Sequence, residues 1–253
     1  MDFESFVLAA ATDDLADAES TVACEHADAV EFRMDGADAA AEPGAVSPSV
    51  TALAEYEGSL PVIATNRAAW EGGEAGAAVP PAEQDAYGRT QDRNRLESLA
   101  AAASIDAVVA VDVELASLEA DSPGVEMVLS EAAAHDVAVV ASSHDFDGTP
   151  DRDEMSERLA AGLEHGDVAK LAVTAESRAD ALDVLAVTET FGSRDDPVAT
   201  MAMGEVGRHT RAVAPVYGSR IGYAPVDPSG ATAPGQYDLA TLSGLVADLG
   251  VDR

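Results

Sequence analysis

Residues 137–175 read VAVVASSHDFDGTPDRDEMSERLAAGLEHGDVAKLAVTA, in which two apolar runs flank a segment with helical spacing. The runs Val137–Asp145 and Val168–Ala175 are short and apolar, as buried strands are. Between them, Glu154–His165 places its Met and Leu side chains on one face, as an amphipathic helix does. The stretch therefore predicts a strand, a helix and a second strand in succession.

The same alternation extends along the whole chain. Six more apolar runs precede segments with helical spacing: Phe6–Thr12, Ala29–Asp35, Leu60–Arg67, Ala107–Leu115, Val198–Gly204 and Val216–Tyr223. Eight strand-then-helix units in 253 residues predict an α/β protein, a single-domain (β/α)8 TIM barrel over residues 1–253. An open doubly wound sheet is the alternative, but no Gly-rich dinucleotide-binding loop follows an early strand.

Two Gly- and Pro-rich stretches, Glu71–Pro81 and Ala224–Gln236, could be taken for linkers between domains. Each of them directly follows a predicted strand. We therefore expect both to be long loops at the carboxyl ends of the barrel strands, where barrel enzymes carry their active sites.

The composition is strongly acidic, with 47 Asp and Glu against 14 Lys and Arg and a formal net charge of −33. This excludes a nucleic-acid-binding protein held by a basic patch. The acidic residues are spread along the chain, and at molar salt, where the Debye length is ~3 Å, their mutual repulsion is weak. We therefore expect a protein adapted to a salt-rich cytoplasm.

The sequence carries no signal for a membrane or secreted protein. No apolar run approaches the ~20 residues of a membrane span, and the first residues lack the basic start of a signal peptide. A cytoplasmic protein is expected instead. Cys24 is the only cysteine, which excludes an intrachain disulfide and a cysteine-based zinc site, and we expect it to be a small buried side chain.

Charged and polar side chains interrupt several predicted strands. The outward face of a barrel strand packs under helices, so such side chains are expected to point inward. The inward candidates are Glu31, Arg33, Asp35, Arg67, Asp112, Glu114, Ser142, His144 and Lys170. Burying these charges without pairing them would be prohibitive. We favour an active site, and a purely structural ion-pair network stays open as the alternative.

Lys170 is the only lysine among the 14 basic residues. If the site needed only a positive charge, arginine would serve, whereas only lysine forms an imine with a carbonyl compound. Imine formation needs a neutral amine, which burial in an apolar strand beside arginines favours. His144 ends the neighbouring strand, and imidazole suits proton transfer near neutrality. The pair predicts imine-assisted proton abstraction.

Other functions share parts of this pattern. A class I aldolase would use the same lysine for carbon–carbon cleavage. A metal-dependent hydrolase would need several histidines at strand ends, and of the five histidines only His144 is placed so. A non-enzymatic acidic binding protein would make the buried charges structural.

Six strings in order along the chain resemble one known family. They are Glu31-Phe32-Arg33-Met34-Asp35, Arg67-Ala68-Ala69-Trp70-Glu71-Gly72-Gly73, Ser143-His144-Asp145-Phe146, Ala169-Lys170-Leu171-Ala172, Met203-Gly204-Glu205-Val206-Gly207 and Ala233-Pro234-Gly235-Gln236. Together they are similar to the type I 3-dehydroquinate dehydratases, in a haloarchaeal-like form. The resemblance implies a (β/α)8 barrel of the shikimate pathway that dehydrates 3-dehydroquinate to 3-dehydroshikimate without a metal or an organic cofactor.

The resemblance also implies residue roles. It makes Lys170 the imine-forming amine and His144 the general acid and base, with Glu71 in support of His144. It assigns substrate binding to Glu31, Phe32, Arg33, Arg67, Arg211, Thr232 and Gln236. Arg211 would meet the substrate carboxylate, and Thr232 stands where the family commonly has serine. The implied partner is the small-molecule substrate, and relatives suggest a homodimer, for which the sequence shows no interface patch.

Overall fold

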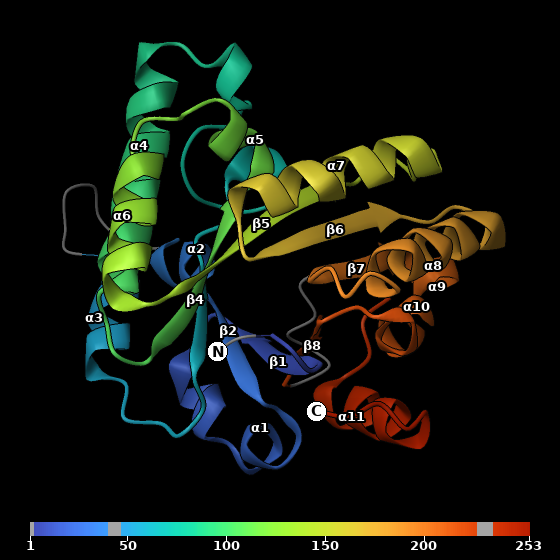
Figure 1. The fold of residues 1–253 in the computed structure, drawn as a ribbon. Helices are drawn as coiled ribbons and strands as arrows, with labels where there is room; N and C mark the ends of the chain where they lie inside the picture. The colour runs from blue at the N-terminus through green and yellow to red at the C-terminus, as the bar shows by residue number, and fades with distance from the viewer. Residues whose placement is uncertain (1–2, 40–46, 227–234) are drawn as a thin grey trace.

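The computed structural model describes residues 3–39, 47–226 and 235–253, and its core is one eight-stranded parallel sheet (Figure 1). The strands are β1 (Val7–Thr12), β2 (Ala29–Arg33), β3 (Val62–Thr65), β4 (Val108–Glu114), β5 (Ala138–Asp145), β6 (Val168–Thr174), β7 (Val198–Met203) and β8 (Ile221–Pro225). Their order is β7-β6-β5-β4-β3-β2-β1-β8. A bridge between Val198 and Ser219 joins the two ends, so the sheet closes into the expected barrel.

Helices cover the outside of the barrel (Figure 1). They are α1 (Thr21–His26), α2 (Met34–Asp38), α3 (Pro48–Glu55), α4 (Ala86–Ala103), α5 (Leu115–Glu119), α6 (Val125–His135), α7 (Arg152–His165), α8 (Arg178–Gly192), α9 (Gly204–Gly207), α10 (Thr210–Val213) and α11 (Leu239–Asp248), with the 3-10 helices η1 (Leu15–Glu19), η2 (Ala69–Glu71), η3 (Pro81–Glu83) and η4 (Ala214–Tyr217). The helix predicted inside the 137–175 stretch is α7. It begins where the Asp151 side chain accepts a hydrogen bond from the Glu154 N–H.

The last strand lies later in the chain than the sequence predicts. The run Val216–Tyr223 was expected to be a strand, but Ala214–Tyr217 forms η4, and β8 begins only at Ile221. Proline at the start of η4 favours the turn, and Gly218 ends it at φ 101°, a conformation that favours glycine. The strand can therefore start only after the turn is complete.

The barrel interior has two layers. The lower layer is apolar and contains Val7, Ala9, Ala29, Ile63, Ala110, Val140, Val168, Ala199 and Ile221. Two positions further along their strands, Glu31, Asp112 and Lys170 are also buried. Since side chains alternate along a strand, these three residues point inward as well, above the apolar layer. The charged layer thus lies nearer to the carboxyl ends of the strands than the apolar layer does.

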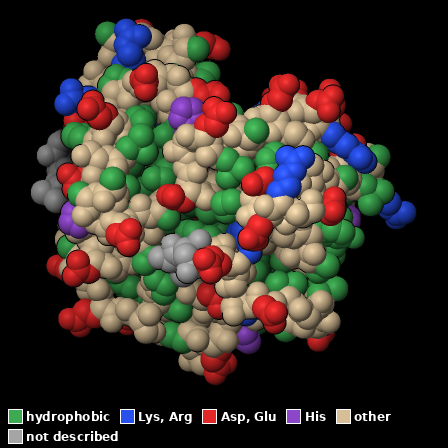
Figure 2. Space-filling model, in the orientation of Figure 1, with side chains coloured by type: hydrophobic (Ala, Val, Ile, Leu, Met, Phe, Trp, Pro, Cys, Tyr) green, Lys and Arg blue, Asp and Glu red, His purple; other side chains and the backbone are tan. Residues whose placement is uncertain are grey.

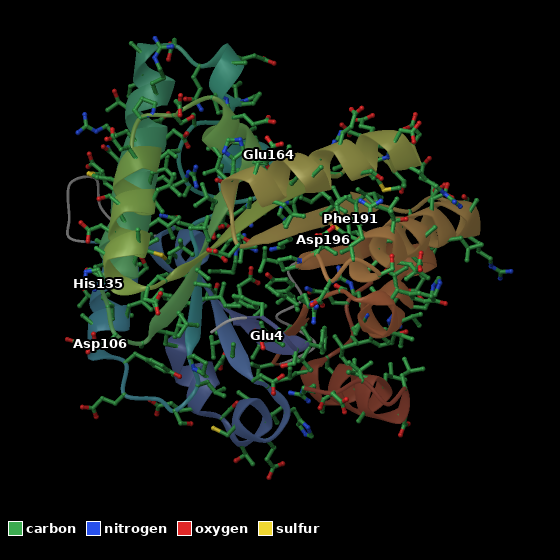
Figure 3. All side chains as sticks on the ribbon, in the orientation of Figure 1. Glu4, Asp106, His135, Glu164, Phe191 and Asp196 are labelled. Atoms are coloured by element: carbon green, nitrogen blue, oxygen red, sulfur yellow. The ribbon has the colours of Figure 1, made fainter. Side chains whose placement is uncertain are left out.

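The surface carries the dispersed acidic charge that the sequence indicates. Figure 2 shows carboxylate side chains scattered over the visible face, and Figure 3 shows Asp106, His135 and Glu164 at the periphery of the fold. The prediction that Cys24 is buried is wrong. The structure places Cys24 at an exposed position of the short helix α1. No helix within the described residues is long and apolar enough to cross a membrane.

Candidate active site

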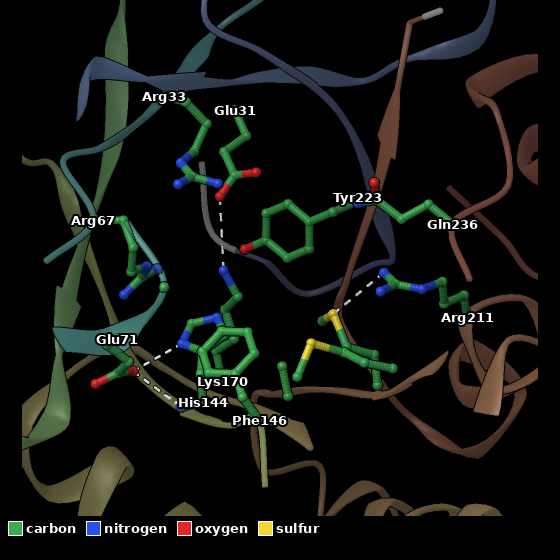
Figure 4. A pocket seen from close by; sticks show the side chains of 14 residues that line it. Glu31, Arg33, Arg67, Glu71, His144, Phe146, Lys170, Arg211, Tyr223 and Gln236 are labelled. Carbon is green, nitrogen blue, oxygen red and sulfur yellow. Dashed lines mark hydrogen bonds and ion pairs between the residues drawn. The ribbon is translucent and has the colours of Figure 1, made fainter. Parts of the chain in front are cut away.

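A cavity opens at the carboxyl ends of the strands (Figure 4). It encloses about 550 Å³ of empty space, its open mouth included. Its walls include eight predicted site residues, Glu31, Arg33, Arg67, Glu71, His144, Lys170, Arg211 and Gln236, together with Gly72, Phe146, Ala172, Met201, Met203 and Tyr223. Residues from most of the barrel strands therefore converge on one space.

Two predicted substrate-binding residues are not among these walls. Phe32 lies between Glu31 and Arg33 on β2, so its side chain points to the opposite face of the sheet. There it is buried in the outer core with Val30 and Leu53, between the barrel and its helices. Thr232 lies outside the described residues.

Lys170 stands in the middle of β6, opposite Ser142 on β5. Its amine donates a hydrogen bond of 3.0 Å to Asp112 Oδ2 and lies 3.7 Å from Glu31 Oε1. The amine also lies 4.2 Å from the centre of the Tyr223 ring. Although the residue is only 5% exposed, it faces the cavity. The sequence led us to expect arginines beside this amine, but its nearest charged neighbours are two carboxylates.

Arg67 joins Asp112 to Glu114 and Ser142 in a hydrogen-bonded network. Its guanidinium donates to Asp112 Oδ1 at 2.6 Å, to Glu114 Oε1 at 3.1 Å and to Ser142 Oγ at 2.6 Å. Burial alone would lower the pKa of Arg67, but Asp112 and Glu114 together raise it above its ordinary value. Burial would likewise raise the pKa of Asp112, yet Arg67 and Lys170 hold it below the ordinary range. Each charge on this wall is thus stabilised by an opposite one.

The network continues into helix α4. Arg95 pairs with Glu114 Oε2 at 2.9 Å and with Asp92 Oδ1 at 2.9 Å. Arg95 also donates to the Asn66 carbonyl at 2.7 Å, next to Arg67 in the chain. Burial would lower the pKa of Arg95, but Glu114 and Asp92 raise it above its ordinary value. Arg95 on helix α4 therefore helps to fix the orientation of Arg67, through Glu114 and through the backbone of Asn66.

His144 forms a second unit with Glu71. The Nδ1 atom of His144 lies 2.8 Å from Glu71 Oε1, and the His144 backbone N–H donates to the same oxygen at 3.0 Å. Burial, Arg67 and Lys170 lower the pKa of His144 well below its ordinary value, and burial raises the pKa of Glu71 to about 8. The imidazole is therefore neutral at neutral pH, as a general base must be. It faces the cavity on the side of Lys170 (Figure 4).

Phe146 and Gly72 hold this unit in place. The Phe146 ring stacks on the His144 ring, with centroids 6.0 Å apart and planes 10° apart. Gly72 follows Glu71 at φ 80°, and a Cβ atom there would meet the Phe146 ring. Glycine is needed at this turn for both reasons.

Arg211 lies on the opposite wall of the cavity and has different neighbours from those of Arg67. It comes from α10, is 5% exposed, and its Nη1 contacts Met201 Sδ at 3.7 Å. Among residues 3–39, 47–226 and 235–253 no carboxylate lies within ion-pair distance of it, and its Nε has no hydrogen-bond partner. Burial lowers the pKa of Arg211 to about 10. A buried cation without a carboxylate is a ready site for an anionic ligand.

Several functional neighbours were missed at the sequence level. Asp112 and Glu114 were identified as inward charges without a role, and their parity with Lys170 was the available signal. Tyr223 closed the misplaced eighth strand, so its position at the cavity could not be foreseen. No three or more His, Cys, Asp or Glu side chains of the described segments are grouped so that they could hold a metal ion.

Residues 5–252 match the family model of the type I 3-dehydroquinases. The chain belongs to this family. It is 49% identical to the 3-dehydroquinate dehydratase of Haloarcula marismortui over 253 residues, which are 100% of both chains. It is 47% identical to that of Halobacterium salinarum over 251 residues, 98% of this chain and 100% of the relative.

A solved structure shows the same fold in the family. The crystal structure of 3-dehydroquinate dehydratase from Geobacillus kaustophilus has a TM-score of 0.76 and 27% identity, covering 96% of this chain and 91% of the other. The resemblance to type I 3-dehydroquinases and the TIM barrel are therefore both confirmed. The haloarchaeal relatives accord with the salt adaptation expected from the composition.

Proposed function

We propose that Lys170 and His144 dehydrate 3-dehydroquinate to 3-dehydroshikimate in this cavity through an imine on Lys170. Membership of the type I 3-dehydroquinases identifies the activity, a 3-dehydroquinate dehydratase of the shikimate pathway and thus a hydro-lyase. The family assignment therefore excludes the three alternatives considered from the sequence, a class I aldolase, a metal-dependent hydrolase and a non-enzymatic binding protein. The observation that carries the residue assignment is a buried lysine amine that faces a cavity together with a neutral histidine from the adjacent strand.

The covalent step begins at the amine of Lys170. Asp112 accepts a hydrogen bond from this amine and holds it in position, and the Lys170 ammonium must lose a proton before it attacks. Attack on the C3 ketone and loss of water give an iminium, which acidifies the hydrogens on C2. The amine lies over the Tyr223 ring, whose face stabilises a cation, so it also favours the iminium.

His144 then carries out the proton transfers. The neutral imidazole removes one hydrogen from C2, and the resulting enamine expels the C1 hydroxyl, which His144 protonates as it leaves as water. Hydrolysis of the conjugated imine releases the product and restores Lys170. Glu71 holds Nδ1 of His144 at 2.8 Å, which fixes the ring while its other nitrogen exchanges the proton.

Binding is divided between the two walls of the cavity. Arg211 meets the substrate carboxylate, with Gln236 beside it on the same side of the cavity (Figure 4). Glu31, Arg33 and Arg67 surround the ring hydroxyls from β2 and the end of β3. Thr232 completes this set in the proposal. A carboxylate held at one wall leaves C3 of the ring within reach of the amine.

Single substitutions test the two central roles. Formation of the conjugated ketone from 3-dehydroquinate is followed by its absorbance in molar KCl. Lys170→Ala should lower kcat by ~10⁴-fold or more because the covalent route is lost. His144→Ala should lower kcat by ~10²-fold or more while the imine still forms. His165→Ala, which alters an exposed histidine at the end of α7, is the control. Near-normal turnover by either site variant would remove that residue from its role.

We also propose that residues 1–253 form one catalytic domain, because the family match spans residues 5–252. The cytoplasmic location and the homodimer stay predictions. Light scattering in molar KCl measures the mass in solution and so tests the homodimer, because a monomer has a mass of 25.8 kDa.

A further inference from the structure

The hydroxyl of Tyr223 is a buried polar group in the cavity for which the reaction outlined above has no use. The side chain is 4% exposed, lies on β8 and forms part of the cavity wall. Its Oη atom has no hydrogen-bond partner among the described residues. A buried hydroxyl without a partner destabilises a protein by ~1–3 kcal/mol. Such a group is expected where a ligand supplies the partner.

The surroundings of this hydroxyl are those of the reacting amine. Lys170 Nζ lies 4.2 Å from the centre of the Tyr223 ring. Glu31 and Asp112, the two carboxylates nearest the amine, are also the negative charges that act most on Tyr223. Figure 4 shows the hydroxyl directed toward the space between Glu31 and Lys170. A group bonded to the carbon that Lys170 attacks would therefore lie close to Oη.

The hydroxyl can act only as a neutral hydrogen-bonding group. Burial, Glu31 and Asp112 raise the pKa of Tyr223 well above its ordinary value. It therefore keeps its proton near neutral pH, so its O–H can donate a hydrogen bond to an oxygen atom but cannot serve as a base.

We propose that the Tyr223 hydroxyl hydrogen-bonds the oxygen that leaves C3 when the imine forms and the oxygen that adds to C3 when the imine is hydrolysed. This inference rests on the proposed function of Lys170. In the first step the C3–O bond breaks, and the two protons that the ammonium loses end on the departing oxygen as water. The second step is the reverse. Tyr223 gives up no proton in either step, and its hydrogen bond positions the oxygen in both.

Tyr223→Phe tests the proposal, because it removes the hydroxyl and keeps the ring under Lys170. The readout is enzyme-catalysed exchange of the ketone oxygen of 3-dehydroshikimate with ¹⁸O-labelled water, which requires imine formation and hydrolysis only. Loss of one hydrogen bond to the reacting oxygen should slow this exchange by ~10-fold. Tyr87→Phe, which removes a hydroxyl from a side chain that is 71% exposed, should leave the exchange unchanged.

Stability separates this role from a structural one. Since the hydroxyl has no hydrogen-bond partner among the described residues, Tyr223→Phe should melt at the same temperature as the unaltered protein or higher. A lower melting temperature, a failure to fold, or an exchange rate within twofold of the unaltered protein would overturn the proposal.

The same samples distinguish failure of the inference from failure of the proposed function. If the unaltered protein catalyses no oxygen exchange and gives no borohydride-reduced adduct on Lys170, both the proposed function and the inference fail. If it does both, and Tyr223→Phe exchanges oxygen normally, the inference alone fails.

Discussion

Arg67 and Arg211 are both buried and face the same cavity, but from opposite walls with different surroundings. Arg67 donates to Asp112, Glu114 and Ser142, and its carboxylate partners raise its pKa. Among residues 3–39, 47–226 and 235–253, the side chain of Arg211 has a hydrogen-bond contact only with the sulfur of Met201, and burial lowers its pKa to about 10. The first guanidinium is stabilised by the protein itself. The second is left with a charge that an anionic substrate can neutralise.

The difference assigns separate tasks to the two walls. The wall formed by β2 to β5 is a set of mutually paired charges, complete before any ligand binds. It fixes the surroundings of the reacting amine. The wall formed by β7, α10 and β8 buries a cation at the expense of stability. Binding of a carboxylate there relieves this cost, so the interaction contributes to substrate affinity.

The largest effect on stability is expected at Arg67. Arg67→Ala leaves Asp112 and Glu114 buried with fewer partners, and should lower the free energy of unfolding by about 3–5 kcal/mol. For a domain of this size the melting temperature should fall by roughly 6–20 °C. Arg93→Ala is the control, because Arg93 is 58% exposed and pairs with Glu97 at the surface of α4. Its effect should stay below about 1 kcal/mol.

Denaturant unfolding of both variants in molar KCl measures these changes. If Arg67→Ala were as stable as Arg93→Ala, the paired wall would not be a stabilised network, and the contrast with Arg211 would fail.

A smaller effect, and on activity alone, is expected at Arg211. Arg211→Ala removes the cation that meets the substrate carboxylate, so kcat/KM should fall by ~10²–10³-fold. The stability of the variant should be unchanged or greater, because no carboxylate in the described part of the chain loses a partner. Arg178→Ala, at an exposed position of α8, is the matched control. Steady-state kinetics and thermal melting of the same samples check both statements, and a marked loss of stability would show that Arg211 is also held by the protein.

The smallest effect concerns Glu71, which burial keeps neutral at neutral pH. Burial raises the pKa of Glu71 from 4.5 to about 8, so at neutral pH the folded protein holds a proton that the unfolded chain releases. This contribution to stability is fully present below about pH 4.5 and is lost as the pH rises through about 8. Its slope is at most about 1.4 kcal/mol per pH unit.

Glu71→Gln should therefore make the free energy of unfolding less dependent on pH between 5 and 8. Urea unfolding at several pH values in molar KCl measures the slope, with Glu97→Gln at the surface as the control. An unchanged slope in Glu71→Gln would mean that Glu71 is ionised in the folded protein.

Much of the paired wall could be predicted from the sequence. Period-two placement of Glu31, Arg33, Asp112 and Lys170 in apolar runs required these side chains to point inward, and a closed barrel brings inward side chains together. The hydrogen bonds among them could not be read in advance. We expected Lys170 beside arginines, but its amine donates a hydrogen bond to Asp112. Strand register decides which inward side chains meet, and the sequence does not give the register.

The second wall was less predictable. Arg211 lies on a short helix after β7, where no strand alternation determines its direction, and its role came from resemblance. Tyr223 was obscured because η4 displaced the start of β8. Arg95 reaches Glu114 from α4, a contact that requires the helix to pack on the barrel before it can be seen. Helical spacing identifies a buried face, but it does not identify the partner of a charged residue on that face.

The central claim, that the Lys170 amine bonds to the substrate carbon, is tested most directly by reductive trapping. The protein is mixed with 3-dehydroshikimate in molar KCl, reduced with borohydride, and examined by intact mass and peptide mapping. We predict one adduct per chain, located on Lys170 and absent from Lys170→Ala. An adduct on another residue, or none in a preparation that turns over 3-dehydroquinate, would contradict the account.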